Sequence, residues 1–157
     1  MKGGVKLVYS PEEAEKVSKN MLGHRLFTKQ TGREGKPCNE VMVCQRLYTR
    51  REFYFAITLE RSYGGPVIIT STQGGSNIEQ IAAEHPEAII KERIDLDKGL
   101  TEEQAQKLAH RLGFEGDAQT QAMDIMQKLY KLFRSKDCIL LEINPLAETT
   151  DGQVVCM

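Results

Sequence analysis

The stretch from Arg51 to Ser71, REFYFAITLERSYGGPVIITS, carries the clearest fold signal in the sequence. Its first half alternates between apolar and more polar positions, which is typical of a strand with one face in a core; the apolar positions are Phe53, Phe55, Ile57 and Leu59. A turn at residues 63–66 leads into a second apolar run at residues 67–71. We therefore expect two antiparallel strands, with the first packing on helices that contain Leu108 and Met126.

Helices and strands alternate along the rest of the chain. Toward the N-terminus, Ser10 and Pro11 mark the start of a helix that Gly23 ends, and strands are expected at residues 26–30 and 40–47. Toward the C-terminus, helices are expected at residues 78–84, 101–113 and 116–133, and strands at residues 89–94 and 138–144, the last of them ending at Pro145. The predicted fold class is α+β, a mixed and mostly antiparallel sheet with packed helices.

Composition narrows the class of protein. The chain has 157 residues, of which 40% are hydrophobic and 27% charged, with a formal net charge of −1. So small a net charge argues against a protein that holds nucleic acid by bulk charge, and no apolar run is long enough to predict a membrane span. No two of the four cysteines form a CxxC pair, so reduced thiols are expected.

The strongest local signal for chemistry is Glu142-Ile143-Asn144-Pro145, at the predicted end of an apolar strand. Residues two apart on a strand face the same side, and carboxylate and amide oxygens both suit Mg²⁺. The alternative is a polar strand end that faces water.

Other features give weaker signals. The glycine pairs in Lys2-Gly3-Gly4 and Gln73-Gly74-Gly75-Ser76 could place amides toward an anion or could be plain turns. The basic run of Arg46, Arg50 and Arg51 is expected to be a solvated face. None of the three histidines has a nucleophile at a recognisable spacing.

Taken together, these segments resemble the ATP-grasp region of the β subunits of succinyl-CoA synthetase (succinate–CoA ligase), over essentially the whole chain and in the same order. The matching pieces are Gly3-Gly4-Val5, Leu22-Gly23, Thr28-Lys29-Gln30-Thr31, Glu60-Arg61-Ser62, Gly65-Pro66-Val67, Gln73-Gly74-Gly75, Ile78-Glu79, Pro86-Glu87-Ala88-Ile89-Ile90-Lys91 and Glu142-Ile143-Asn144-Pro145-Leu146. Val43-Cys44 and residues 48–52 look more like the ADP-forming mitochondrial type than the GDP-forming or bacterial ones.

The resemblance implies a role for each matching residue. Cys44, Gln45, Arg46 and Leu47 would form the hinge that reads the adenine, and Glu52 would bind the ribose side of ADP or ATP. Asn144 would be one Mg²⁺ ligand, and Glu142 would lie near a phosphohistidine of the partner α subunit. Residues 1–47 would belong to the ATP-grasp lid subdomain and hinge, and residues 48–157 to a second subdomain.

The resemblance also implies what the chain would do. The family makes ATP from ADP and phosphate while it cleaves succinyl-CoA to succinate and CoA, in the mitochondrial matrix for this type. The family's phosphate-binding lysine and Gly-Arg-Gly stretch would precede Lys2, and a second Mg²⁺ carboxylate would follow Met157. We therefore expect this chain to be an excised ATP-grasp fragment, truncated at both ends, that binds nucleotide poorly and is inactive alone.

The turn around Asp151 and Gly152 allows two hairpin registers. A two-residue turn would place Thr150 opposite Gln153, whereas a three-residue loop with Gly152 in the left-handed region would place Thr149 opposite Gln153. We expect the three-residue loop, because it would put position 158 opposite Asn144 on the same face, where both could hold one Mg²⁺.

Two alternatives stay open. The chain could belong to the GDP-forming isoform of the same enzyme. It could also be a non-catalytic interaction module that keeps the ATP-grasp fold and has lost the site; the presence of Glu52, Glu142 and Asn144 speaks against this. Nucleic acid and membrane are not expected as partners.

Overall fold

The computed structural model describes residues 4–28, 31–74 and 78–157, in two compact units, Met1–Arg46 and Leu47–Met157. Each unit is described by itself. No helix in these residues is both long and apolar enough to cross a membrane.

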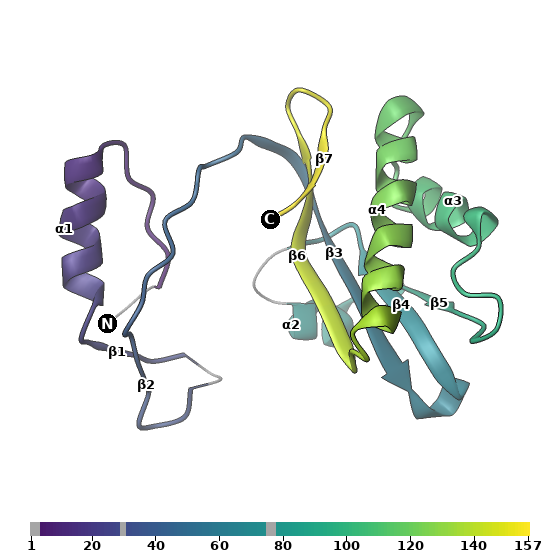
Figure 1. Cartoon of the computed structure of the whole chain (residues 1–157), viewed down its shortest axis with the longest axis horizontal. Coiled ribbons are helices and arrows are strands. Elements are labelled where there is room, and N and C mark those ends of the chain that lie inside the picture. The colour runs from purple at the N-terminus through teal and green to yellow at the C-terminus, as the bar shows by residue number, and fades with distance from the viewer. Residues whose placement is uncertain (1–3, 29–30, 75–77) are drawn as a thin grey trace. The chain divides into compact units, whose positions relative to one another are not determined.

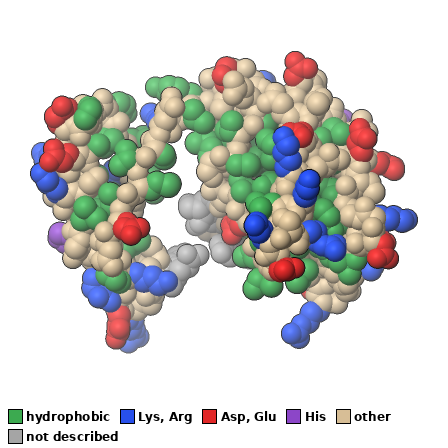
Figure 2. Space-filling view, in the orientation of Figure 1, with side chains coloured by type: hydrophobic (Ala, Val, Ile, Leu, Met, Phe, Trp, Pro, Cys, Tyr) green, Lys and Arg blue, Asp and Glu red, His purple; other side chains and the backbone are tan. Residues whose placement is uncertain are grey.

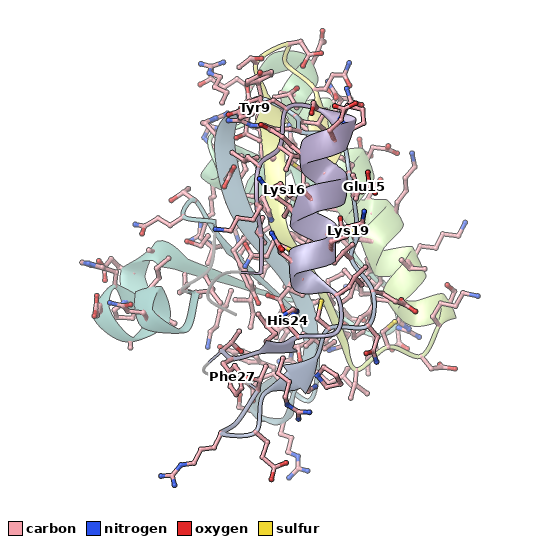
Figure 3. All side chains as sticks on the ribbon, turned by 90° about the vertical axis from the view of Figure 1, so that its left-hand side faces the viewer. Tyr9, Glu15, Lys16, Lys19, His24 and Phe27 are labelled. Atoms are coloured by element: carbon pink, nitrogen blue, oxygen red, sulfur yellow. The ribbon has the colours of Figure 1, made fainter. Side chains whose placement is uncertain are left out.

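The described part of the first unit contains one helix, α1 (Pro11–Met21), and two short paired strands, β1 (Arg25–Leu26) and β2 (Lys36–Pro37). The Ser10 hydroxyl accepts a hydrogen bond from the Glu13 amide at 3.2 Å, which caps the helix as predicted. On the exposed side of α1, Lys19 and Glu15 form an ion pair one turn apart (Figure 3).

The strand predicted at residues 40–47 is absent from the described structure, where residues 38–48 form no helix or strand. The pairing of β1 with β2 depends on a tight turn at Gly35. Its φ is 66°, and a Cβ there would lie 2.8 Å from the Leu26 carbonyl oxygen. The chain therefore turns back tightly enough for Lys36 and Pro37 to become the partners of β1. Of the other predicted strand, residues 29–30 lie outside the described residues.

The second unit is a five-stranded antiparallel sheet in the order β5-β4-β3-β6-β7 (Figure 1). Its strands are β3 (Thr49–Glu60), β4 (Gly65–Ser71), β5 (Ile89–Arg93), β6 (Leu140–Thr149) and β7 (Val154–Cys156). Its helices are α2 (Ile78–Glu84), α3 (Glu102–Arg111) and α4 (Gly116–Ser135), with short 3₁₀ turns at η1 (Arg61–Tyr63) and η2 (Pro86–Ala88). Thr101 and Gln104 make the predicted capping box of α3.

The core lies between one face of this sheet and the helices α3 and α4 (Figure 1). Phe53, Phe55 and Ile57 join Leu108 and Met126 in one buried cluster, as predicted. Leu59 does not: it lies opposite Pro66 beside the turn and is 53% exposed. Lysine and arginine side chains lie among hydrophobic and acidic ones on the outer side of α4 (Figure 2).

Strand β6 does not end at Pro145 as predicted but continues to Thr149. Phe53 pairs with Leu146 and Phe55 with Ile143, so β6 carries one extra residue between these pairs. A β-bulge tolerates proline because its residues leave the regular hydrogen-bond ladder.

The hairpin between β6 and β7 has the predicted three-residue loop. Gly152 has a φ of 80°, and the Thr149 amide donates to the Gln153 carbonyl at 2.9 Å. Gln121 of α4 fastens the hairpin, since its amide oxygen accepts from the Val154 amide at 3.0 Å and its amide nitrogen donates to the Gly152 carbonyl at 3.3 Å.

Candidate functional site

Glu52 and Glu142, two of the site residues predicted in the sheet, lie on the face opposite α3 and α4, which we call the second face. Phe53, Phe55 and Ile57 point to the helices, so Glu52, Tyr54 and Ala56, which alternate with them along β3, point the other way. Cross-strand partners share a face. Glu142, which pairs with Ala56, and Ala147, which pairs with Glu52, therefore belong to the second face.

Glu52 is held at its side chain and at its backbone. Its Oε1 accepts a hydrogen bond from the Thr49 hydroxyl at 2.9 Å. Its carbonyl oxygen accepts from the Gly74 amide at 3.1 Å. The side chain is exposed, so its second carboxylate oxygen can meet a ligand.

Gly74 can lie this close only because it has no side chain. A Cβ at this position would be 2.8 Å from the Phe53 nitrogen and 2.9 Å from the Glu52 carbonyl carbon. The described part of the predicted glycine loop is thus packed against the strand that carries Glu52. Gly75 and Ser76 lie outside the described residues.

Glu142 and Asn144 are both exposed, two residues apart on β6. Because Glu142 lies opposite Ala56, four residues along β3 from Glu52, the backbones of the two glutamates are separated by about 13 Å along the strand direction. Ligands of one Mg²⁺ lie about 2 Å from the ion. The backbones of Glu52 and Glu142 are therefore too far apart for the two side chains to hold the same Mg²⁺ ion.

The donor set for Mg²⁺ is incomplete in the described residues. Asn144 carries a neutral amide oxygen two residues along β6 from the Glu142 carboxylate, and both oxygen types suit a hard cation that also takes ligands from phosphate and water. No group of three or more histidine, cysteine, aspartate or glutamate side chains able to hold a metal occurs in the described ranges. The assignment of Asn144 as a Mg²⁺ ligand therefore stays a prediction.

The predicted hinge residues lie in extended chain outside any helix or strand. Cys44, Gln45 and Arg46 are exposed and Leu47 is half-buried. The boundary between the two compact units falls between Arg46 and Leu47. Cys44, Gln45 and Arg46 thus belong to the first unit and Leu47 to the second, and their role as a hinge stays a prediction.

The prediction of a solvated basic face was wrong for Arg51. Its Nε donates to Glu148 Oε2 at 2.7 Å, its Nη2 also contacts that oxygen, and its Nη1 donates to the Gly113 carbonyl at 2.9 Å. Its guanidinium lies 5.3 Å and 5.4 Å from the ring centres of Phe53 and Phe114, within cation–π range. The Glu148 side chain is only 5% exposed. Sequence spacing gave no sign of this pair, because its members are 97 residues apart.

A polar concavity of about 480 Å³ lies elsewhere in the second unit, between β5 and the start of α3. It contains none of the predicted site residues; it is lined by Arg93, Asp95, Lys98, Gly99, Thr101 and Gln104. The backbone amides of Lys98 and Asp97 hold the pKa of the Asp95 carboxyl below its usual range. The carboxylate thus serves the turn that shapes the concavity.

Known proteins resemble this chain over its whole length. The mitochondrial succinate–CoA ligase (ADP-forming) subunit beta of Columba livia is 56% identical over 157 residues, 100% of this chain and 38% of that protein. The subunit of the same name from Caenorhabditis elegans is 50% identical over 100% of this chain and 36% of its own length. The GDP-forming subunit beta of Sus scrofa is 49% identical over 99% of this chain and 36% of its own length. The chain thus spans less than two fifths of each of these relatives.

A solved structure of ATP citrate lyase from Methanothrix soehngenii, in complex with citrate and coenzyme A, has the same fold. It superimposes with a TM-score of 0.61 at 18% identity, covering 93% of this chain and 31% of that chain. A family model described as the ATP-grasp domain matches residues 2–148. With nearly the whole chain matched by that model, this protein belongs to the ATP-grasp family.

Proposed function

We propose that this chain is the nucleotide- and Mg²⁺-binding portion of the β subunit of an ADP-forming succinate–CoA ligase. The complete enzyme would convert succinyl-CoA, phosphate and ADP to succinate, CoA and ATP through a phosphohistidine on its α subunit, in the mitochondrial matrix. Relatives named as mitochondrial, ADP-forming β subunits support this assignment. The chain alone is expected to catalyse nothing.

One observation carries the proposal: Glu52, Glu142 and Asn144 are exposed side chains of two neighbouring strands, and Glu52 and Glu142 share the second face. Their spacing suits an extended ligand better than a single ion. In the proposal, Glu52 binds the ribose and Asn144 is a ligand of the Mg²⁺ that accompanies the phosphates. Cys44, Gln45, Arg46 and Leu47 form the hinge for the base.

The register of β7 bears on the rest of the metal site. Leu146 pairs with Cys156, and the Met157 amide donates to the Pro145 carbonyl at 3.1 Å. A residue following Met157 in the same register would lie opposite Asn144. A carboxylate there could complete the Mg²⁺ site, since opposite Cβ atoms are about 4.5 to 5.5 Å apart.

Glu142 is assigned to the end of the site that meets the phosphohistidine of the α subunit. The test is Glu142→Gln in the complete β subunit paired with its α subunit, because this change keeps the shape and removes the charge. We expect slowed phosphorylation of the histidine by ATP in rapid-quench measurements and little change in nucleotide affinity.

Glu103→Gln is the matched control for this test, since Glu103 is an exposed glutamate in the first turn of α3, on the other side of the sheet. Normal histidine phosphorylation in the Glu142→Gln enzyme would remove the assigned role.

The second candidate is the GDP-forming isoform, because GDP-forming subunits of Dictyostelium discoideum and Sus scrofa are 50% and 49% identical to this chain. A competition assay with ADP and GDP on the complete enzyme separates the two candidates. Preference for ADP supports the proposal, and preference for GDP replaces it with the second candidate.

A further inference from the structure

We propose that Thr49 is a positioning residue for Glu52, and that a β-bulge at Arg50 exists in this strand to bring the two side chains together. This inference rests on the proposed function, in which Glu52 binds the ribose of the nucleotide. It adds a residue that the resemblance did not identify and gives it a specific task.

Thr49 and Glu52 hydrogen-bond although their spacing in a regular strand would put them on opposite faces. Thr49 and Glu52 are three residues apart on β3. In a regular strand such residues point to opposite faces, because side chains alternate with a period of two. Their side chains nevertheless hydrogen-bond, with 2.9 Å between Thr49 Oγ1 and Glu52 Oε1.

A register shift between β3 and β6 explains how Thr49 and Glu52 come to lie on the same face. Thr49 pairs with Thr149 and Arg51 pairs with Glu148, so β3 holds one more residue than β6 in this interval. The extra residue is Arg50. Thr149 faces away from its neighbour Glu148, and Glu148 lies on the helix side with Arg51. Thr49 therefore shares the second face with Glu52, as cross-strand partners do.

The hydrogen bond from Thr49 restricts the orientation of the Glu52 carboxylate. A glutamate on a strand can rotate about three side-chain bonds, and an exposed one adopts several rotamers. The Thr49 hydroxyl occupies Oε1, while the backbone carbonyl of Glu52 is fixed by the Gly74 amide at 3.1 Å. These contacts select one orientation and leave Oε2 to accept from a ligand hydroxyl. Bulges beside binding sites commonly re-aim a side chain in this way.

The test is nucleotide binding by the complete β subunit in complex with its α subunit, measured by calorimetry. ADP and 2′,3′-dideoxy-ADP are the two ligands, because the second lacks the ribose hydroxyls that Glu52 would bind. Thr49→Val removes the hydroxyl and keeps the shape and the strand preference. Thr49→Ser restores a hydroxyl.

We expect Glu52→Ala to weaken ADP binding by about 10- to 100-fold, the range for a hydrogen bond to a charged group. Thr49→Val should weaken ADP binding by about 3- to 10-fold, because the carboxylate is still present but no longer oriented. Thr49→Ser should recover most of that loss. Neither Thr49→Val nor Glu52→Ala should change the affinity for dideoxy-ADP, and Thr49→Val should have no further effect in the Glu52→Ala background.

Thr58→Val is the matched control. Thr58 is a half-buried threonine of the same strand on the same face, and its hydroxyl donates to the Ile139 carbonyl at 3.3 Å. Its loss should leave the affinity for both nucleotides unchanged.

The outcomes distinguish the ribose role of Glu52 from the positioning role of Thr49. If Glu52→Ala leaves ADP binding unchanged, the ribose role in the proposed function is wrong and the positioning role is lost with it. If Glu52→Ala weakens binding but Thr49→Val does not, the ribose role stands and the positioning role is overturned. Equal losses for ADP and dideoxy-ADP in Thr49→Val would mean a general structural effect, which also overturns it.

Discussion

The Arg51–Glu148 pair should make the second unit far more sensitive to loss of the arginine than to loss of the negative charge. Arg51→Met leaves the Glu148 carboxylate, 5% exposed, with Arg50 as its remaining ion partner among the described residues, at 3.3 Å, and the Arg50 side chain is 68% exposed. Removing one partner of a buried pair costs about 3 to 5 kcal/mol of unfolding free energy, because the other charge stays buried. We expect Arg51→Met to fall in this range.

Glu148→Gln should cost less, about 1 to 2 kcal/mol. The glutamine keeps the shape, and Arg51, 35% exposed, still donates to the Gly113 carbonyl and still lies against the rings of Phe53 and Phe114. The double variant Arg51→Met/Glu148→Leu removes both charges, so its stability should return to within about 1 to 2 kcal/mol of the original protein.

The assay is urea unfolding followed by circular dichroism, with the slope m compared between variants to check that the unfolding transition is the same. Lys128→Met is the control, because Lys128 and Asp124 form an exposed ion pair, 74% and 56% exposed, that should contribute less than about 0.5 kcal/mol. The reasoning is refuted if Glu148→Gln destabilises as much as Arg51→Met, or if the double variant is no more stable than Arg51→Met.

Three further predictions concern other parts of the second unit. Phe55 is fully buried, so Phe55→Ala should cost about 3 to 5 kcal/mol in a denaturant melt; a loss under about 1 kcal/mol would mean that the buried face is misassigned. Gly74→Ala should destabilise markedly, whereas Gly65→Ala should be tolerated, because a Cβ at Gly74 meets backbone at 2.8 Å and one at Gly65 meets its nearest atoms at 3.7 Å; equal melting temperatures would contradict this. The lowered pKa of Asp95 means that its carboxylate protects the Lys98 amide above the ordinary value of 3.8, and that protection is lost as the pH falls through the lower pKa of the folded state; hydrogen exchange should show this step in the original protein and none in Asp95→Ala.

The features that the sequence predicted correctly are those with local causes. Alternation along residues 53–57 placed the core face of β3, and the spacing of Thr101 and Gln104 gave the start of α3. Both depend on residues only a few positions apart, where the physical preferences are strong. The loop at Gly152 is different: local preference allowed two registers, and the three-residue loop was predicted because it puts position 158 opposite Asn144.

The features that were missed depend on partners far away in the sequence. Arg51 looked like part of a solvated basic run until β6 brought Glu148 to it. The hydrogen bond from Thr49 to Glu52 needs a bulge at Arg50, whose existence depends on how β3 pairs with β6. No pattern within β3 specifies that pairing. The roles of Cys44, Gln45, Arg46 and Leu47 stay predictions, because they require a bound base.

One extra residue in β6 places Glu142, a predicted site residue, and Glu148, the buried partner of Arg51, on opposite faces of the sheet. Strict alternation would put Glu142, Asn144 and Glu148 on one face, so either the first two would be buried under α4 or Glu148 would be exposed. The bulge beside Pro145 shifts the alternation by one residue, because a one-residue change of register reverses the face of every side chain beyond it. Glu142 is thereby left on the second face, while Glu148 turns into the helix side to meet Arg51. Proline suits this position because a bulge does not require its missing amide hydrogen.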